Sequence, residues 1–195
     1  MTSRGRGRPP AAGKTVSPGQ ILAEALAILE TDGLEALTMR ALAGRAGINP
    51  MTIYHHFDDR DGLIRALAEL AYSELAAPET GNALERAHSL IRAYYATVVR
   101  FPDLTLAIFA RSCLFPERAR RITDEIRDLL AEHGLSSQKS VQWTHILVDY
   151  THGAALAAAP HSKTESGQPA TEAGLTDFNI GLAELFETIR RASIA

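Results

Sequence analysis

The chain has 195 residues, of which 46% are hydrophobic and 22% charged, which is ample for a well-packed core in one or two domains. Its single cysteine excludes an intrachain disulfide, and no apolar stretch suits a signal peptide or a membrane span, so we expect a soluble, cytoplasmic protein without a membrane partner. The formal net charge of −3 argues against a wholly basic nucleic-acid binder, so the distribution of charge matters more than its sum.

The first 16 residues form a basic arm. They hold four basic side chains (Arg4, Arg6, Arg8 and Lys14) and no acid, whereas the rest of the chain is acidic. The arm is rich in glycine and proline and is predicted to be disordered in isolation. Its run RGRP at residues 6–9 resembles the core of an AT-hook, in which Arg-Gly-Arg lies in a narrow minor groove. We therefore expect Arg6 and Arg8 to reach DNA, with a purely solubilising tail as the alternative.

Helix signals follow directly after the arm. Ser17 with Pro18 predicts a helix start, and Gly33 predicts its end near Asp32. Between these points an apolar stripe recurs at helical spacing: Ile21, Leu22, Ala25, Ile28 and Leu29.

Residues 38–60 predict two short helices joined by a tight turn. Thr38 is a capping residue, Gly47 can take the left-handed conformation that closes a helix, and Asn49 caps a second helix that starts at Pro50. This second helix buries two apolar residues and leaves a short polar and aromatic face outward, made of Met51, Thr52, Tyr54, His55 and His56. Such a face suits base edges and phosphates, so the pattern predicts a DNA-reading helix-turn-helix.

The remaining chain is also predicted to be helical. A helix follows Arg60 and links two domains, and further helices are expected over about 83–100, 103–113, 116–133, 136–158 and 175–191, with a polar loop over 159–174. No strand pattern appears. The expected fold is all-α, with a three-helix DNA-binding domain over 17–65 and a helical domain over 66–195.

Three pieces of residues 37–63 carry a family resemblance: LTxRxLA, GIxxxTIYxHF and xxRxxL. Together they resemble the tetracycline-repressor (TetR) family of bacterial transcriptional regulators, over about residues 17–67. The resemblance implies DNA contacts at Thr52, Tyr54 and His56 and further contacts at Arg40 and Arg60. With the arm and the outward face, the predicted DNA-binding set is Arg6, Arg8, Thr38, Arg40, Met51, Thr52, Tyr54, His55, His56 and Arg60.

The last two predicted helices offer a surface for a second copy. The apolar stripe of the last helix is wider than packing on one side needs, and the small residues near 153–159 allow helices to approach closely. The resemblance implies a four-helix dimer interface here, while packing within one chain is the alternative. The predicted interface residues are Gly153, Ala154, Ala157, Phe178, Leu182, Leu185 and Ile189.

The resemblance also implies a small apolar or amphipathic effector held between helices of the second domain. Aromatic and polar residues that could line such a site are Tyr94, Tyr95, Phe109, Trp143, His145, Asp149, Tyr150 and Phe178. The expected function is that of a repressor that binds a palindromic DNA operator as a homodimer and is released by an unknown small molecule.

Enzymatic and metal-binding patterns are weak. His145, Asp149 and His152 share one helix face and could bind zinc, or could be buried polar groups at the dimer seam. Glu85 and His88 form one pair of a di-iron pattern that needs two, and Cys113 lies in an apolar run that favours burial. We find no catalytic signature and expect no metal, cofactor or enzymatic activity. The alternatives are a weakly specific architectural DNA-binding protein and an all-α metal-dependent enzyme.

Overall fold

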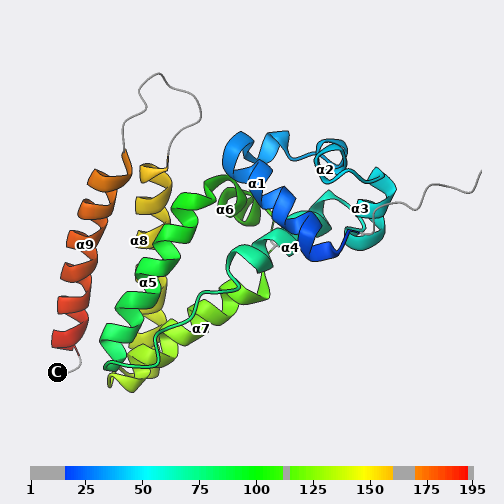
Figure 1. Ribbon diagram of the computed structural model, residues 1–195. Coiled ribbons are helices and arrows are strands. Elements are labelled where there is room, and N and C mark those ends of the chain that lie inside the picture. Colours follow the sequence, from blue (N-terminus) through cyan, green and yellow to red (C-terminus); the bar gives the residue numbers. More distant parts are fainter. Residues whose placement is uncertain (1–15, 112–114, 160–169, 193–195) are drawn as a thin grey trace, which may run out of the picture. The chain divides into compact units, whose positions relative to one another are not determined.

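The computed structural model describes residues 16–111, 115–159 and 170–192, and within these ranges it contains helices, turns and loops but no strand (Figure 1). The all-α prediction is confirmed. No helix in the described ranges is long and apolar enough to cross a lipid bilayer. The helices are α1 (Pro18–Ala36), α2 (Met39–Ala46), α3 (Pro50–Phe57), α4 (Arg60–Ala71), α5 (Ala83–Arg100), α6 (Pro102–Ala110), α7 (Glu117–Glu132), α8 (Ser137–Ala158) and α9 (Ala170–Ala192).

The chain divides into two compact units, the first ending at Leu63 and the second beginning at Ile64. The first unit starts with a capping box in which Gln20 N donates to Ser17 Oγ at 3.3 Å and Ser17 N donates to Gln20 Oε1 at 2.9 Å. Val16, at the end of the predicted arm, is already buried in the described structure. The core of this unit consists of fully buried aliphatic side chains: Ile21, Ala25, Leu37, Leu42, Ile53 and Leu63.

Helix α1 runs further than its sequence predicts. Gly33 has φ 79° and ψ 176°, which breaks the regular helix where we expected its end, but a further turn continues to Ala36. The connection to α2 therefore consists of only two residues, Leu37 and Thr38.

The predicted caps of α2 and α3 are confirmed. Ala41 N donates to Thr38 Oγ1 at 3.1 Å, and Met51 N donates to the Asn49 side chain at 2.9 Å. Between the two helices Gly47 is left-handed, with φ 69° and ψ 34°, and Ile48 N donates to the Ala43 carbonyl at 3.0 Å. These bonds act over a few residues, which is why local sequence predicts them well.

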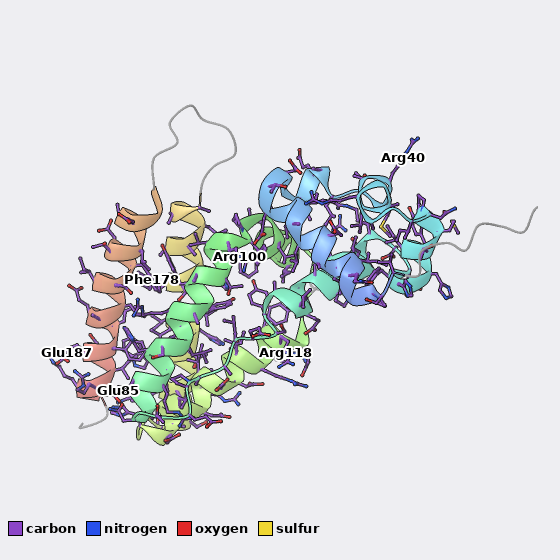
Figure 2. All side chains as sticks on the ribbon, in the orientation of Figure 1. Arg40, Glu85, Arg100, Arg118, Phe178 and Glu187 are labelled. Atoms are coloured by element: carbon purple, nitrogen blue, oxygen red, sulfur yellow. The ribbon has the colours of Figure 1, made fainter. Side chains whose placement is uncertain are left out.

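The second unit is a helical bundle in which α5 packs against α7, α8 and α9, and α8 packs against both α7 and α9 (Figure 1). Phe178 points from α9 towards the neighbouring helices (Figure 2). Helix α9 begins at Ala170, earlier than the predicted start at Leu175. A Cβ atom at Gly174 would lie 2.7 Å from the Ala158 Cβ, so α8 and α9 approach closely at this point. The remainder of the predicted loop, residues 160–169, lies outside the described residues, as do residues 112–114 of the helix expected to reach Cys113.

Candidate functional site

The outward face of α3 is the most distinctive exposed surface of the first unit. Ile53 and Phe57 point into the core, whereas Met51 is 69% exposed and Tyr54 is 41% exposed. His55 and His56 are exposed beside each other, with ring centroids 5.7 Å apart, and Thr52 is partly buried. The structure thus brings the predicted residues of this helix together on one short helix, although their contacts with DNA stay predictions.

Two further predicted residues, Thr38 and Arg40, lie at the amino-terminal end of α2, where Thr38 is the capping residue before the helix. The Thr38 oxygen accepts the capping hydrogen bond, which leaves its O–H group able to donate to a phosphate oxygen. Arg40 is exposed and extends away from the helix (Figure 2). The remaining predicted contacts of the arm, Arg6 and Arg8, lie outside the described residues.

Arg60 differs from the other predicted DNA contacts because its guanidinium turns towards the protein. Its Nη2 atom donates to the Leu34 carbonyl at 3.0 Å, and its Nε atom donates to the Leu37 carbonyl at 3.4 Å. The side chain is partly buried. The resemblance implied a contact to DNA at this position and contained no signal for these two bonds, because the acceptors are backbone atoms that lie more than 20 residues earlier.

Five of the eight predicted effector residues fall into two aromatic clusters in the second unit. In one, Phe178 stacks between Tyr95 and Tyr150, with ring centroids 3.9 Å and 5.5 Å from them. In the other, the Tyr94 hydroxyl lies 2.5 Å from His152 Nε2, and the Phe109 ring meets the His152 ring at 4.6 Å. His145 and Asp149 are exposed on α8, and Trp143 is partly buried.

Sequence analysis missed Tyr72 and Thr105, which extend the second cluster. The Tyr72 hydroxyl and Thr105 Oγ1 lie 3.1 Å apart, and the Tyr72 and Tyr94 rings are 5.8 Å apart. Burial raises the pKa of both tyrosines and lowers the pKa of His152. Tyr72 follows Ile64 and Ala68 at helical spacing, and this periodicity could have identified it as a core residue.

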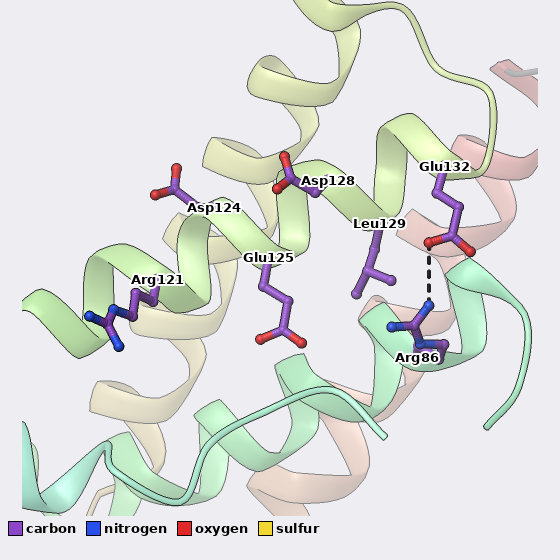
Figure 3. Close-up of a pocket in the computed structure, with 7 residues that line it drawn as sticks. All are labelled: Arg86, Arg121, Asp124, Glu125, Asp128, Leu129 and Glu132. Carbon is purple, nitrogen blue, oxygen red and sulfur yellow. Dashed lines mark hydrogen bonds and ion pairs between the residues drawn. The ribbon is translucent and has the colours of Figure 1, made fainter. Parts of the chain in front are cut away.

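The second unit also contains two grooves, and the residues that line them are not those of the two aromatic clusters. One has a volume of about 330 Å³ and lies between α5 and α7, where Arg86 reaches Glu132 at 3.3 Å (Figure 3). Its lining is mostly charged: Arg86, Arg121, Asp124, Glu125, Asp128, Leu129 and Glu132. The other, of about 530 Å³, is lined by Asn82, Leu84, Glu85, His88, Ser89, His133, Phe186 and Arg190. Neither groove contains a predicted effector residue.

The candidate metal ligands are not brought together. His152 bonds to Tyr94, while His145 and Asp149 are exposed, and the described residues contain no group of three or more His, Cys, Asp or Glu side chains placed to hold a metal ion. Glu85 accepts a capping bond from Asn82 N, and His88 packs edge-on against Phe186. Cys113 lies outside the described residues.

The predicted dimer residues divide into two sets. Phe178, Leu182 and Ile189 are at most 1% exposed because they pack inside their own protomer, as the alternative of packing within one chain requires, and they have no surface left for a partner. Gly153 and Ala157 are exposed, and Ala154 and Leu185 are partly buried. The large apolar side chains that are exposed on α8 and α9 are instead Val141, Ile146, Leu175 and Ile180.

Comparisons with known proteins agree with this architecture. The family model described as "Bacterial regulatory proteins, tetR family" matches residues 21–67. The HTH-type transcriptional repressor KstR2 of Mycobacterium tuberculosis is 26% identical over 135 residues, which span 66% of this chain and 64% of that protein. The chain thus matches slightly less than two thirds of the length of this relative.

Two solved structures share the fold over nearly the whole chain. A TetR variant from Acinetobacter baumannii in complex with minocycline superimposes with a TM-score of 0.75 at 21% identity, covering 92% of this chain and 99% of that one. BioQ with its double-stranded DNA operator superimposes with a TM-score of 0.72 at 20% identity, covering 91% and 99%. The family pattern thus covers residues 21–67, which hold the helix-turn-helix, and the chain shares the helical fold of these two structures over nearly its whole length.

Proposed function

We propose that the protein is a transcriptional repressor that binds a roughly palindromic DNA operator as a homodimer and is released by a small-molecule effector. The observation that carries this proposal is the outward face of α3, held on a short capped helix in a helix-turn-helix. An α-helix fits the major groove of B-DNA, where hydroxyl, imidazole and methyl groups can read base edges. The match of residues 21–67 to the tetR family model also supports a regulator rather than an enzyme and a location in the cytoplasm.

We assign different roles to the side chains around α3. Met51, Thr52 and His55 are the proposed base-reading residues, because a hydroxyl, an imidazole and an apolar chain can each meet a base edge. Thr38, Arg40, Tyr54 and His56 are the proposed phosphate contacts, which position the protein without reading sequence.

We place the effector near the cluster formed by Tyr94, His152 and Phe109. The pair Tyr94–His152 supplies a hydroxyl and an imidazole among aromatic rings, so an amphipathic molecule with a hydrogen-bonding group could exchange with this bond. The TetR variant that shares this fold was crystallised in complex with a small molecule, minocycline.

We place the dimer seam on the outer faces of α8 and α9. Ile180 is 57% exposed on α9, and Ile146 is exposed on α8 together with Gly153 and Ala157. Apolar side chains that face solvent in the protomer gain most from burial against a second copy. A two-fold dimer would present two copies of α3 to two half-sites, which matches a palindromic operator.

Selection of duplexes from a random pool tests the proposal. The wild-type protein should enrich one palindromic sequence, and Thr52→Ala should relax the preference at one position in each half-site, at a cost of about 1–3 kcal/mol if a base contact is lost. Thr80→Ala, the same change at an exposed loop position, is the matched control and should select the wild-type sequence. A pool without any enriched sequence would favour the architectural alternative. Variants of Met51, Thr52 and His55 that all retain the wild-type consensus would overturn the base-reading assignment.

A further inference from the structure

The carboxyl-terminal end of α1 accepts a cation from elsewhere in the chain. The last carbonyls of a helix lack partners within it and carry partial negative charge, so a positive side chain there is stabilising. Helix α1, which lies wholly within the described residues, has no basic residue in its own last turn. Arg60, the first residue of α4, supplies the charge by donating to the Leu34 and Leu37 carbonyls.

These two bonds join the ends of the helix-turn-helix. Leu37 belongs to the two-residue connection before α2, and Arg60 follows the two-residue connection after α3. The segment 38–59, which holds every predicted base-reading residue, therefore runs between two points that the Arg60 side chain holds together. A planar guanidinium with several fixed donors suits such a link, because it can bond two carbonyls in one orientation.

The backbone beside Arg60 is also tightly constrained. A Cβ atom at Gly62 would lie 2.0 Å from the Phe57 carbonyl oxygen, so the first turn of α4 is pressed against the end of α3. Gly62 N donates to Asp59 Oδ1 at 2.7 Å, which caps α4. Between these residues Asp58 has φ 61° and ψ −61°, and Asp59 N donates to the Phe57 carbonyl at 2.7 Å, which is the geometry of a strained γ-turn. Arg60 thus leaves a corner with little freedom to adjust.

We propose that Arg60 is a positioning residue for α3, and that it acts through its bonds to the Leu34 and Leu37 carbonyls and not through a phosphate. This inference rests on the proposed DNA-binding function. By closing the helix-turn-helix at its two ends, the guanidinium holds the recognition helix in the orientation that meets the major groove. Loss of the guanidinium lets α3 move, so operator affinity falls although no contact to DNA has been removed.

The salt dependence of operator affinity separates the two roles. Each phosphate contact that is lost flattens the slope of log affinity against log salt by about 0.9 per subunit. If Arg60 is a positioning residue, Arg60→Ala lowers affinity by about tenfold, as expected for loss of hydrogen bonds from a charged group, with the same slope as the wild type between about 50 and 200 mM salt. Arg40→Ala is the matched control, because this exposed arginine is a proposed phosphate contact and its loss should flatten the slope.

Amide hydrogen exchange in the DNA-free protein supplies a second measurement. In Arg60→Ala the amides of α3, including the Asp58 N–H that donates to the Tyr54 carbonyl, should exchange faster than in the wild type, whereas Arg40→Ala should leave them unchanged. Arg60→Lys keeps the charge without the planar fork, so it should show intermediate affinity and intermediate exchange.

A flattened slope in Arg60→Ala, or α3 amides that exchange as in the wild type, would overturn the proposal. If Arg60→Ala does not fold, Arg60→Lys is the deciding variant. Wild-type operator affinity together with faster exchange of the α3 amides in Arg60→Lys would overturn the proposal, because operator affinity would then depend on the charge and not on the bonds. If the wild-type protein enriches no DNA sequence, the proposed function fails, while the exchange of α3 in the arginine variants still decides whether the link exists.

Discussion

The hydroxyl of Tyr150 occupies the space that a side chain at position 181 would need. A Cβ atom on Gly181 would lie 2.2 Å from this oxygen, which donates a hydrogen bond to the Phe178 carbonyl at 3.1 Å. We expect Gly181→Ala to lower the free energy of unfolding by about 1–3 kcal/mol, because the ring of Tyr150 must leave its stack on Phe178. Thermal or denaturant unfolding measures this change.

Two further variants test the cause. Tyr150→Phe removes the clashing oxygen, so Gly181→Ala should cost less in that background than in the wild type. Gly44→Ala, on a helix with open space around the glycine, should be neutral or stabilising because alanine favours helix. Equal costs of Gly181→Ala in both backgrounds would show that the contact with the hydroxyl is not responsible.

The strained turn at Asp58 predicts a stabilising substitution. A non-glycine residue with this positive φ costs about 1–3 kcal/mol, of which glycine recovers most, less about 1 kcal/mol for its greater freedom in the unfolded chain. Asp58→Gly should therefore raise the melting temperature, whereas Asp58→Asn removes the same charge and keeps the strain. Both variants should bind DNA more tightly, since a carboxylate beside phosphates is repelled. Equal melting temperatures for the two variants would exclude backbone strain as the cause.

Stability should depend on pH through His152. Burial lowers the pKa of this residue in the folded protein, so the unfolded chain binds more protons, and the stabilisation that is present above about pH 6.5 is lost as the pH falls. In the neutral tautomer whose Nε2 accepts from the Tyr94 hydroxyl, protonation also converts this atom into a donor. Between about pH 7 and 5 the free energy of unfolding should fall less steeply in His152→Gln than in the wild type. Part of the loss of stability at low pH should remain in His152→Gln, because burial also lowers the pKa of His88.

The exposed imidazole of His145 provides the control for this experiment. His145→Gln removes a histidine from the same helix without touching the Tyr94 bond and should keep the wild-type pH profile. A wild-type profile in His152→Gln would contradict the prediction.

Substitutions on opposite sides of α9 should separate dimerisation from folding. Ile180→Arg places a charge in the proposed seam and should dissociate the dimer in sedimentation experiments, at a cost of several kcal/mol, with a protomer that remains folded. Leu182→Arg places the same charge in the protomer core and should unfold it. Ala131→Arg, which adds the charge to an exposed position of α7, is the control. A dimer that survives Ile180→Arg would place the seam elsewhere.

Removal of residues 1–14 tests the basic arm. The deletion takes away Arg4, Arg6, Arg8 and Lys14, and each of them that contacts a phosphate should contribute about 0.9 per subunit to the salt slope of operator binding. We therefore expect weaker binding with a flatter slope. Unchanged affinity and slope would assign the arm a solubilising role only.

Features that depend on neighbours within a few residues could be predicted from the sequence. The caps at Ser17, Thr38 and Asn49 and the left-handed Gly47 all act over at most five residues, and the period of the apolar side chains predicted which residues of α3 would face outward. These local signals determined the helix-turn-helix, and the motif carried by the same residues predicted the family.

The tertiary structure alone decided which distant groups meet. Arg60 bonds to carbonyls 23 and 26 residues earlier, and Tyr94 meets His152 at a separation of 58 residues, where nothing in the local sequence names the partner. The apolar stripe of α9 was equally ambiguous, because periodicity shows that Leu182 is buried but not whether its own protomer or a second copy covers it. Burial of Leu182 within the protomer resolves this point, because a hydrophobic contact has no direction and is decided only by which surfaces the folded chain brings together.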